Sequence, residues 1–135
     1  MRIYRITKPE DLQEFWPLLV DMIGKALEYA HDKWSEDDVY DEILRQDKQL
    51  WVVYTQKDIL GCVVTEIVGY PQGNRLGIFL LSGVDFDDWY PLRVEIYSWA
   101  KGYDCRVCEF YGREGWARKL KNFKLTHVVM QEDIK

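Results

Sequence analysis

The sequence predicts an α+β domain in which helices flank one mixed, mainly antiparallel sheet. Two hydrophobic patterns support this fold class: short β-rich runs between turn residues, and longer segments with apolar residues at i, i+3 and i+4 spacing. Their order along the chain is β-α-α-β-β-β-α-β-α-β. A length of 135 residues fits a single domain over residues 1–135, and 47% hydrophobic residues are enough for a core.

The strands are the runs with alternating or continuous apolar residues. The first run, "RIYRIT", alternates. Three later runs follow one another with only "KD" and "PQGN" between them, and these are turn sequences. We therefore expect those three runs to form an antiparallel meander. The expected strands are residues 2–7, 49–56, 59–71, 75–84, 105–111 and 125–134.

The helices are the segments with helical apolar spacing. The first contains Pro17, which is expected to kink it. The second opens on Ser35 with Asp38 three residues later, which resembles a capping box. The third ends at Gly102 and connects two strands that should run parallel, because crossovers of this kind join parallel neighbours. The expected helices are residues 10–30, 35–47, 88–102 and 114–123.

Composition excludes several classes of function. The net charge of −5 and the pI near 5 argue against direct nucleic-acid binding, since DNA-binding domains usually carry a basic face. No apolar run approaches the roughly 20 residues of a membrane span, and the N-terminus does not resemble a signal peptide. Three cysteines, an odd number, are typical of a reduced protein, so we expect a cytoplasmic location.

Cys105 and Cys108 form a C-x-x-C pair, which can indicate zinc or a redox site. On a strand over residues 105–111, the two sulfur atoms would point to opposite faces, which suits neither chemistry. We therefore expect buried structural cysteines and no metal site.

The charge is distributed unevenly along the chain. Residues 28–48 are strongly acidic and residues 112–124 are basic. These segments are either two solvated helix faces or two patches that contact a protein partner or a second copy of the chain. In the second interpretation, Trp34 and Trp51 are expected to be exposed at an interface, because interfaces favour aromatic residues.

The stretch "VCEFYGREGWARKLKNFKLTHV", residues 107–128, resembles the end of the GNAT (N-acetyltransferase) domain. In that family the fifth strand leads into a short helix, followed by the sixth strand. The element order of the whole chain also resembles the GNAT superfamily, and "YGR-x-GWAR" further resembles GNAT-like proteins of tailed bacteriophages. The resemblance implies a GNAT-like fold and, in active members, acetyl transfer from acetyl-CoA to an amine.

Active GNAT proteins bind the CoA pyrophosphate at a glycine-rich loop before the third helix, through backbone N–H groups and the helix dipole. The matching segment here, residues 82–96, has one glycine, Gly83, and three aspartates, Asp85, Asp87 and Asp88. Each carboxylate would repel the diphosphate by on the order of 1 kcal/mol. From this segment we expect the protein to bind no cofactor. If the protein is catalytic, the expected cofactor is acetyl-CoA.

The resemblance also implies site residues. A β-bulge on the fourth strand, which admits the pantetheine in the family, is expected at Gly77 or Gly83. Glu66 is the favoured general base, with Glu109 as the alternative, and Tyr111 is the nearest substitute for the family's tyrosine acid. We expect the cofactor contacts, if any, at Gly83 and at Arg113, which precedes a helix N-terminus.

Two functions follow from these expectations. In the first, a GNAT-fold protein has lost acyl-CoA chemistry and acts as a binding or structural module. A phage-encoded virion component or inhibitor of a host protein would be of this kind, located in the host cytoplasm or the virion. The alternative is an acyl-CoA-dependent N-acetyltransferase with an altered pyrophosphate loop.

Overall fold

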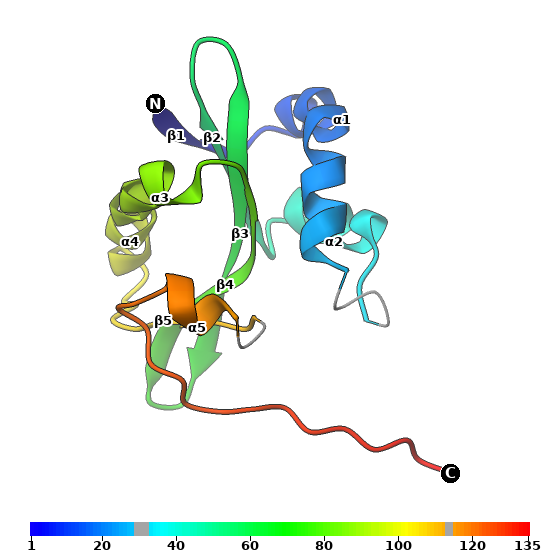
Figure 1. Ribbon diagram of the computed structural model, residues 1–135, viewed down its shortest axis with the longest axis vertical. Coiled ribbons are helices and arrows are strands. Elements are labelled where there is room, and N and C mark those ends of the chain that lie inside the picture. The colour runs from blue at the N-terminus through cyan, green and yellow to red at the C-terminus, as the bar shows by residue number, and fades with distance from the viewer. Residues whose placement is uncertain (29–32, 113–114) are drawn as a thin grey trace.

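The computed structural model describes residues 1–28, 33–112 and 115–135, which form one five-stranded sheet with helices on both faces (Figure 1). The strand order in the sheet is β1-β2-β3-β4-β5. Only β4 and β5 run parallel among these pairs, and the others are antiparallel. The strands are β1 (Arg2–Ile6), β2 (Gln49–Tyr54), β3 (Ile59–Tyr70), β4 (Gly73–Gly83) and β5 (Cys108–Phe110). The predicted fold class, the meander and the parallel crossover pair are confirmed.

The helices divide between the two faces of the sheet (Figure 1). One hydrophobic cluster joins α1 and α2 to one face, and a second joins α3, α4 and α5 to the other. Residues of β2 alternate between these clusters: Leu50 and Val52 belong to the first, Trp51 and Val53 to the second. The helical segments are α1 (Pro9–Ala26), α2 (Glu36–Leu44), α3 (Phe86–Trp89), the 3₁₀ helix η1 (Tyr90–Leu92), α4 (Arg93–Lys101) and α5 (Trp116–Lys119).

The start of α2 is fixed by the capping box that the sequence predicted. The Ser35 hydroxyl accepts a hydrogen bond from the Asp38 N–H at 3.2 Å, and the Asp38 carboxylate accepts one from the Ser35 N–H at 2.9 Å. The backbone hydrogen bond from Ser35 lowers the pKa of Asp38. Such a cap satisfies donors that a helix N-terminus otherwise leaves without partners.

Several expectations about elements need correction. The helix expected over 88–102 is divided into α3, η1 and α4, because Pro91 has no N–H to continue α-helical hydrogen bonding. The fifth strand is shorter than expected, so Cys105 precedes it. Cys105 and Cys108 consequently pack in the same cluster, on the α4 side, instead of pointing to opposite faces; both are free thiols.

The strand expected over residues 125–134 is also absent from the described sheet. After Phe123 the chain leaves the domain as an extended tail (Figure 1). A strand forms only where a neighbour takes up its backbone hydrogen bonds, and the tail has no such neighbour within this chain's described residues. None of the described helices has the length and apolarity of a membrane span.

Candidate functional site

The region of interest begins where β4 and β5 part. Their ladder joins only Leu76, Gly77 and Ile78 to residues 108–110, and β4 then continues to Gly83 without β5. The two strands therefore diverge beyond Ile78, as the resemblance implies.

A β-bulge lies directly at this divergence. On β3, Val64 pairs with Leu80 and the next residue, Thr65, pairs with Ile78. Phe79 is therefore the extra residue on β4. The bulge was expected at Gly77 or Gly83, so the expected position was wrong. The bulge at Phe79 could not be predicted from the sequence, because an aromatic residue in a strand does not indicate a bulge as a glycine can.

Gly83 ends β4 in a conformation that favours glycine, with φ of +148°, and an added Cβ would overlap the carbonyl oxygen of Leu60. The N–H of Val84 donates to that same oxygen at 2.8 Å. The loop after β4 is thus held against β3. It then exposes three carboxylates, those of Asp85, Asp87 and Asp88.

The residues after β4 do not fit a CoA pyrophosphate. Asp85 adopts a left-handed conformation with φ of 54°, and α3 has only the four residues Phe86–Trp89. So short a helix offers few aligned N–H groups for an anion. The exposed aspartates add negative charge where the family binds a diphosphate.

Aromatic side chains connect the diverging ends of β4 and β5. The ring centroid of Trp116, on α5, lies 5.4 Å from that of Phe86 and 5.5 Å from that of Phe110. Phe86 also stacks on Tyr90, with centroids 4.8 Å apart. The segment that follows β4 is therefore packed, through Trp116, against the end of β5. These contacts lie beyond the end of the β4–β5 ladder, where the resemblance implies an opening for pantetheine.

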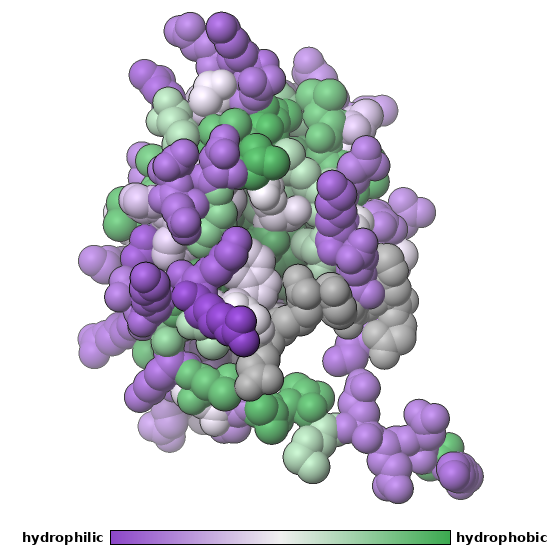
Figure 2. All heavy atoms as spheres, viewed as in Figure 1, coloured by the Kyte–Doolittle hydropathy of each residue, from purple (hydrophilic) through white to green (hydrophobic). Residues whose placement is uncertain are grey.

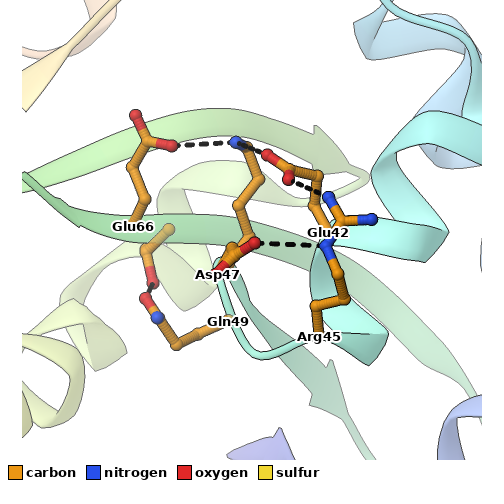
Figure 3. A network of polar contacts seen from close by, with 7 residues as sticks. Glu42, Arg45, Asp47, Gln49 and Glu66 are labelled. Carbon is orange, nitrogen blue, oxygen red and sulfur yellow. Dashed lines mark hydrogen bonds and ion pairs between the residues drawn. The ribbon is translucent and has the colours of Figure 1, made fainter.

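On the other face of the sheet, Glu66 belongs to an ion-pair network around a buried lysine. Lys48 has a 4% exposed side chain, and its Nζ lies 2.8 Å from Glu42 Oε1 and 2.9 Å from Glu66 Oε2. Figure 3 shows Glu66 on β3 and Glu42 on α2 pointing toward this nitrogen. The ammonium group also lies 4.6 Å and 4.7 Å from the ring centroids of Trp34 and Phe79.

The charges of this network stabilise one another. Burial disfavours the charged lysine, but the hydrogen bonds to Glu42 and Glu66 outweigh it and raise the pKa of Lys48. The hydrogen bond from Lys48 in turn lowers the pKa of Glu42. Glu42 also pairs with Arg45 at 2.6 Å. The network fixes α2 to β3 through Lys48, which immediately precedes β2.

Tyr111 lies in a second polar cluster, just beyond β5. Its hydroxyl is 3.2 Å from the Tyr70 hydroxyl and donates to Glu109 Oε1 at 3.3 Å. Glu109 also pairs with Arg75 at 3.1 Å. The hydrogen bond with Tyr70, followed by burial, raises the pKa of Tyr111, which keeps the phenol protonated. The side chain is nevertheless 59% exposed.

The structure places both carboxylate candidates on one face of the sheet. Gly77 on β4 pairs with Glu66 on one side and Glu109 on the other, and residues aligned across a ladder share a face. The Glu66 side chain lies over Gly77, where an added Cβ would be 3.2 Å from its Cγ. Gly83 lies further along β4, in the loop described above. Arg113 lies outside the described residues.

Several residues of this region were not expected from the sequence. Lys48 and Phe79 carried no motif, although a lysine directly before an apolar strand is a signal that could have been noticed. Trp51, expected at an exposed interface, is instead buried, and its Nε1 donates to Thr65 Oγ1 at 3.0 Å. Trp34 is half-buried over Lys48. The described residues contain no group of three His, Cys, Asp or Glu that could hold a metal ion.

No protein-family model matches this sequence, and no curated protein matches it at a significant level. Solved structures do match it over nearly its whole length. A GNAT family acetyltransferase of Staphylococcus aureus has a TM-score of 0.68 at 10% identity, covering 99% of this chain and 100% of its own. The aminoglycoside 6'-N-acetyltransferase of Acinetobacter haemolyticus has 0.71 at 14%, covering 100% and 99%. A ribosomal-protein-alanine N-acetyltransferase of Brucella melitensis has 0.68 at 13%, also covering 100% and 99%. The shared architecture, the parallel β4–β5 pair and the bulge beside it together establish that this chain has the GNAT-like fold.

Proposed function

We propose that this GNAT-like domain is a binding or structural module that does not use acyl-CoA. The observation that carries the proposal is the aromatic contact of Trp116 with Phe86 and Phe110, which joins the segment after β4 to the end of β5, where the resemblance implies an opening. On the same face of the sheet, between the sheet and α4, the pocket lined by Ile78, Leu81 and Trp89 among others has a volume of about 10 Å³. That is room for no more than a water molecule.

The electrostatics of the loop after β4 support the same proposal. Asp85, Asp87 and Asp88 are exposed where a diphosphate would need positive charge or free N–H groups. A phage-encoded virion component or an inhibitor of a host protein would use the fold in this way, as a surface for another macromolecule.

The test is titration calorimetry of the protein with acetyl-CoA, together with its melting temperature. We expect neither saturable heat nor a thermal shift. A ligand at 100 times its dissociation constant would add about 2.7 kcal/mol of stability, so binding would be visible. The control is a CoA-binding GNAT acetyltransferase titrated under the same conditions. Micromolar affinity in the wild type would refute the proposal.

Variants separate the two causes of poor binding. Asp87→Asn removes one negative charge beside the loop with little change in shape, and Trp116→Ala removes the aromatic contact across the opening. If the proposal holds, detectable acetyl-CoA binding appears only in the variants, most strongly in the double variant. Circular dichroism confirms that each variant remains folded.

The alternative function, an acetyl-CoA-dependent N-acetyltransferase, is favoured by one observation. The bulge at Phe79 and the divergence of β4 and β5 are retained, with Glu66 on the adjacent strand. A free-thiol assay with acetyl-CoA and a panel of amines tests it. Thiol release by the wild type that is lost in Glu66→Gln would establish this alternative in place of the binding module.

A further inference from the structure

We infer that the side chain of Lys48 occupies a binding site for a primary ammonium group and keeps external amines out of it. Two aromatic rings and two carboxylates form this site, those of Trp34, Phe79, Glu42 and Glu66, which we call the ammonium cage. The cage lies on the α1–α2 side of the sheet. Its role is therefore separate from that of the α4 side, on which the proposed function rests.

The burial of Lys48 is the first sign of such a site. Figure 2 shows hydrophilic side chains projecting at the rim of the molecule, which is where lysines usually lie. The Lys48 side chain is 4% exposed instead. A buried ammonium is costly unless its surroundings replace water. The cage does so, because its two carboxylates accept hydrogen bonds and its two rings present their faces to the cation (Figure 3).

The walls of the cage belong to separate elements of the fold, and the occupant belongs to a connection between elements. Glu42 lies on α2, Glu66 on β3 and Phe79 on β4, while Trp34 directly precedes the capped start of α2. The rings of Trp34 and Phe79 meet edge to face, with centroids 5.0 Å apart and an interplanar angle of 74°. The walls are thus held by the sheet, by α2 and by each other, and Lys48 reaches in from the loop before β2.

Two backbone features of β4 shape the cage. Phe79 and its neighbour Leu80 both pack on the α1–α2 side, although successive residues of a regular strand face opposite sides. The bulge therefore turns the Phe79 ring toward the ammonium. Gly77, which has no side chain, leaves room for the Glu66 side chain to lie across β4, where an added Cβ would be 3.2 Å from Glu66 Cγ.

The chemistry of the walls selects a primary ammonium group. Such a group has three N–H donors and a full positive charge. The oxygens of Glu42 and Glu66 that face Lys48 Nζ lie 2.8 Å and 2.9 Å away, so each accepts one of these donors. A quaternary ammonium has no N–H to donate, and an alcohol has no charge for the carboxylates and rings to attract. The ligand class is therefore a primary alkylammonium.

Lys48 consequently closes the amine side of the domain. A general base must lie within hydrogen-bond reach of the amine that it deprotonates, and the resemblance assigns that role to Glu66. The nitrogen within this reach of Glu66 is that of Lys48. A second ammonium in the cage would meet a like charge at short range and would find the carboxylate oxygens already bonded.

The test removes the occupant and supplies it from solution. Lys48→Ala deletes the side chain beyond Cβ, and propylammonium carries the same carbon and nitrogen atoms. We expect propylammonium to raise the melting temperature of Lys48→Ala and to give saturable heat in calorimetry, binding at least about tenfold more tightly than propanol, because hydrogen bonds to charged groups are the strong ones. Wild type should not respond. Tetramethylammonium and sodium chloride at equal ionic strength control for charge screening.

Matched variants locate the binding. Lys48→Met fills the cage with its own side chain, and Lys57→Ala removes an exposed lysine, so neither should bind propylammonium. Adding Glu66→Gln to Lys48→Ala should abolish the binding. All these titrations omit acyl-CoA, so their outcome is independent of the test of the proposed function.

Three results would overturn the inference. They are an effect of propylammonium on Lys48→Ala no larger than that of propanol, an equal effect on Lys48→Met, and binding to the wild type that Glu66→Gln removes. If Lys48→Ala is unfolded on its own, circular dichroism replaces the melting curve, because a ligand that binds the folded state restores folding. Failure of propylammonium to restore it would overturn the inference equally.

Discussion

Replacing Lys48 by methionine tests whether the buried network stabilises the fold. Methionine keeps an unbranched side chain against Trp34 and Phe79 but removes the charge. Removing one partner of a buried ion pair costs about 3–5 kcal/mol. Here the carboxylates of Glu42 and Glu66 retain 19% and 27% exposure, and Glu42 keeps Arg45. We therefore expect a loss of about 2–3 kcal/mol, or a melting temperature lower by about 10 °C.

The assay is urea unfolding followed by tryptophan fluorescence at pH 7. Lys57→Met is the matched control, since Lys57 is exposed in the turn between β2 and β3. The triple variant with Glu42→Gln and Glu66→Gln should recover part of the loss, because neutral groups need no buried counter-charge. If Lys48→Met costs no more than Lys57→Met, the reasoning about the network is wrong.

The difference in stability between the wild type and Lys48→Met should also depend on pH. The pKa of Glu42 is lowered in the folded state, so its contribution is present above its usual value of 4.5 and is lost as pH falls through the folded pKa. The pKa of Lys48 is raised, so its contribution is present below 10.5 and is lost as pH rises through the folded pKa. The stability gap between wild type and Lys48→Met should therefore be widest between these limits and shrink toward pH 3. A gap that stays constant down to pH 3 would contradict this assignment.

Two further variants test the sheet itself. Thr65→Val should lower the free energy of unfolding in urea by about 1–3 kcal/mol, because it leaves Trp51 Nε1 and Gln49 Oε1 without the buried hydroxyl that both contact. Thr65→Ser keeps the hydroxyl and should lower it less. A larger loss in Thr65→Ser than in Thr65→Val would disprove the role of the hydroxyl. Gly83→Ala should lower the melting temperature more than Gly73→Ala. Both glycines have positive φ, but only at Gly83 would the added Cβ meet backbone atoms. Equal melting temperatures would contradict this, because they would show that the loop after β4 accommodates the Cβ.

Local sequence patterns were sufficient to predict most of the helices and strands. Ser35 and Asp38 form the expected cap because a capping box involves only neighbouring residues. The meander from β2 to β4 followed from two short turns, and the crossover helix required β4 and β5 to be parallel. Leu120 and Trp116, four residues apart, both pack on the α4-side cluster, because spacing along a helix decides which side chains share a face.

The candidate site was predictable only in outline. Glu66, Tyr111 and Gly83 were chosen from positions that match the family, but the contacts of each depend on residues far away in the sequence. Glu66 pairs with Lys48 because β3 lies beside β2, and Tyr111 meets Tyr70, the last residue of β3, because β4 alone separates β3 from β5 in the sheet. A bulge at Phe79 depends on how two strands align, and no single residue type indicates it.

Local periodicity and residue type were enough to predict the fold class, the order of strands and helices as far as α5, and the acidic character of the loop after β4. Tertiary structure decided three other matters: the burial of Lys48 between two carboxylates, the aromatic contact between α3, α5 and β5, and the absence of a sixth strand from the described part of the chain. The last case gives the physical reason most clearly. Residues 125–134 have the composition of a strand, but a strand exists only where a neighbouring edge accepts its hydrogen bonds, and the position of that edge is a property of the assembled molecule.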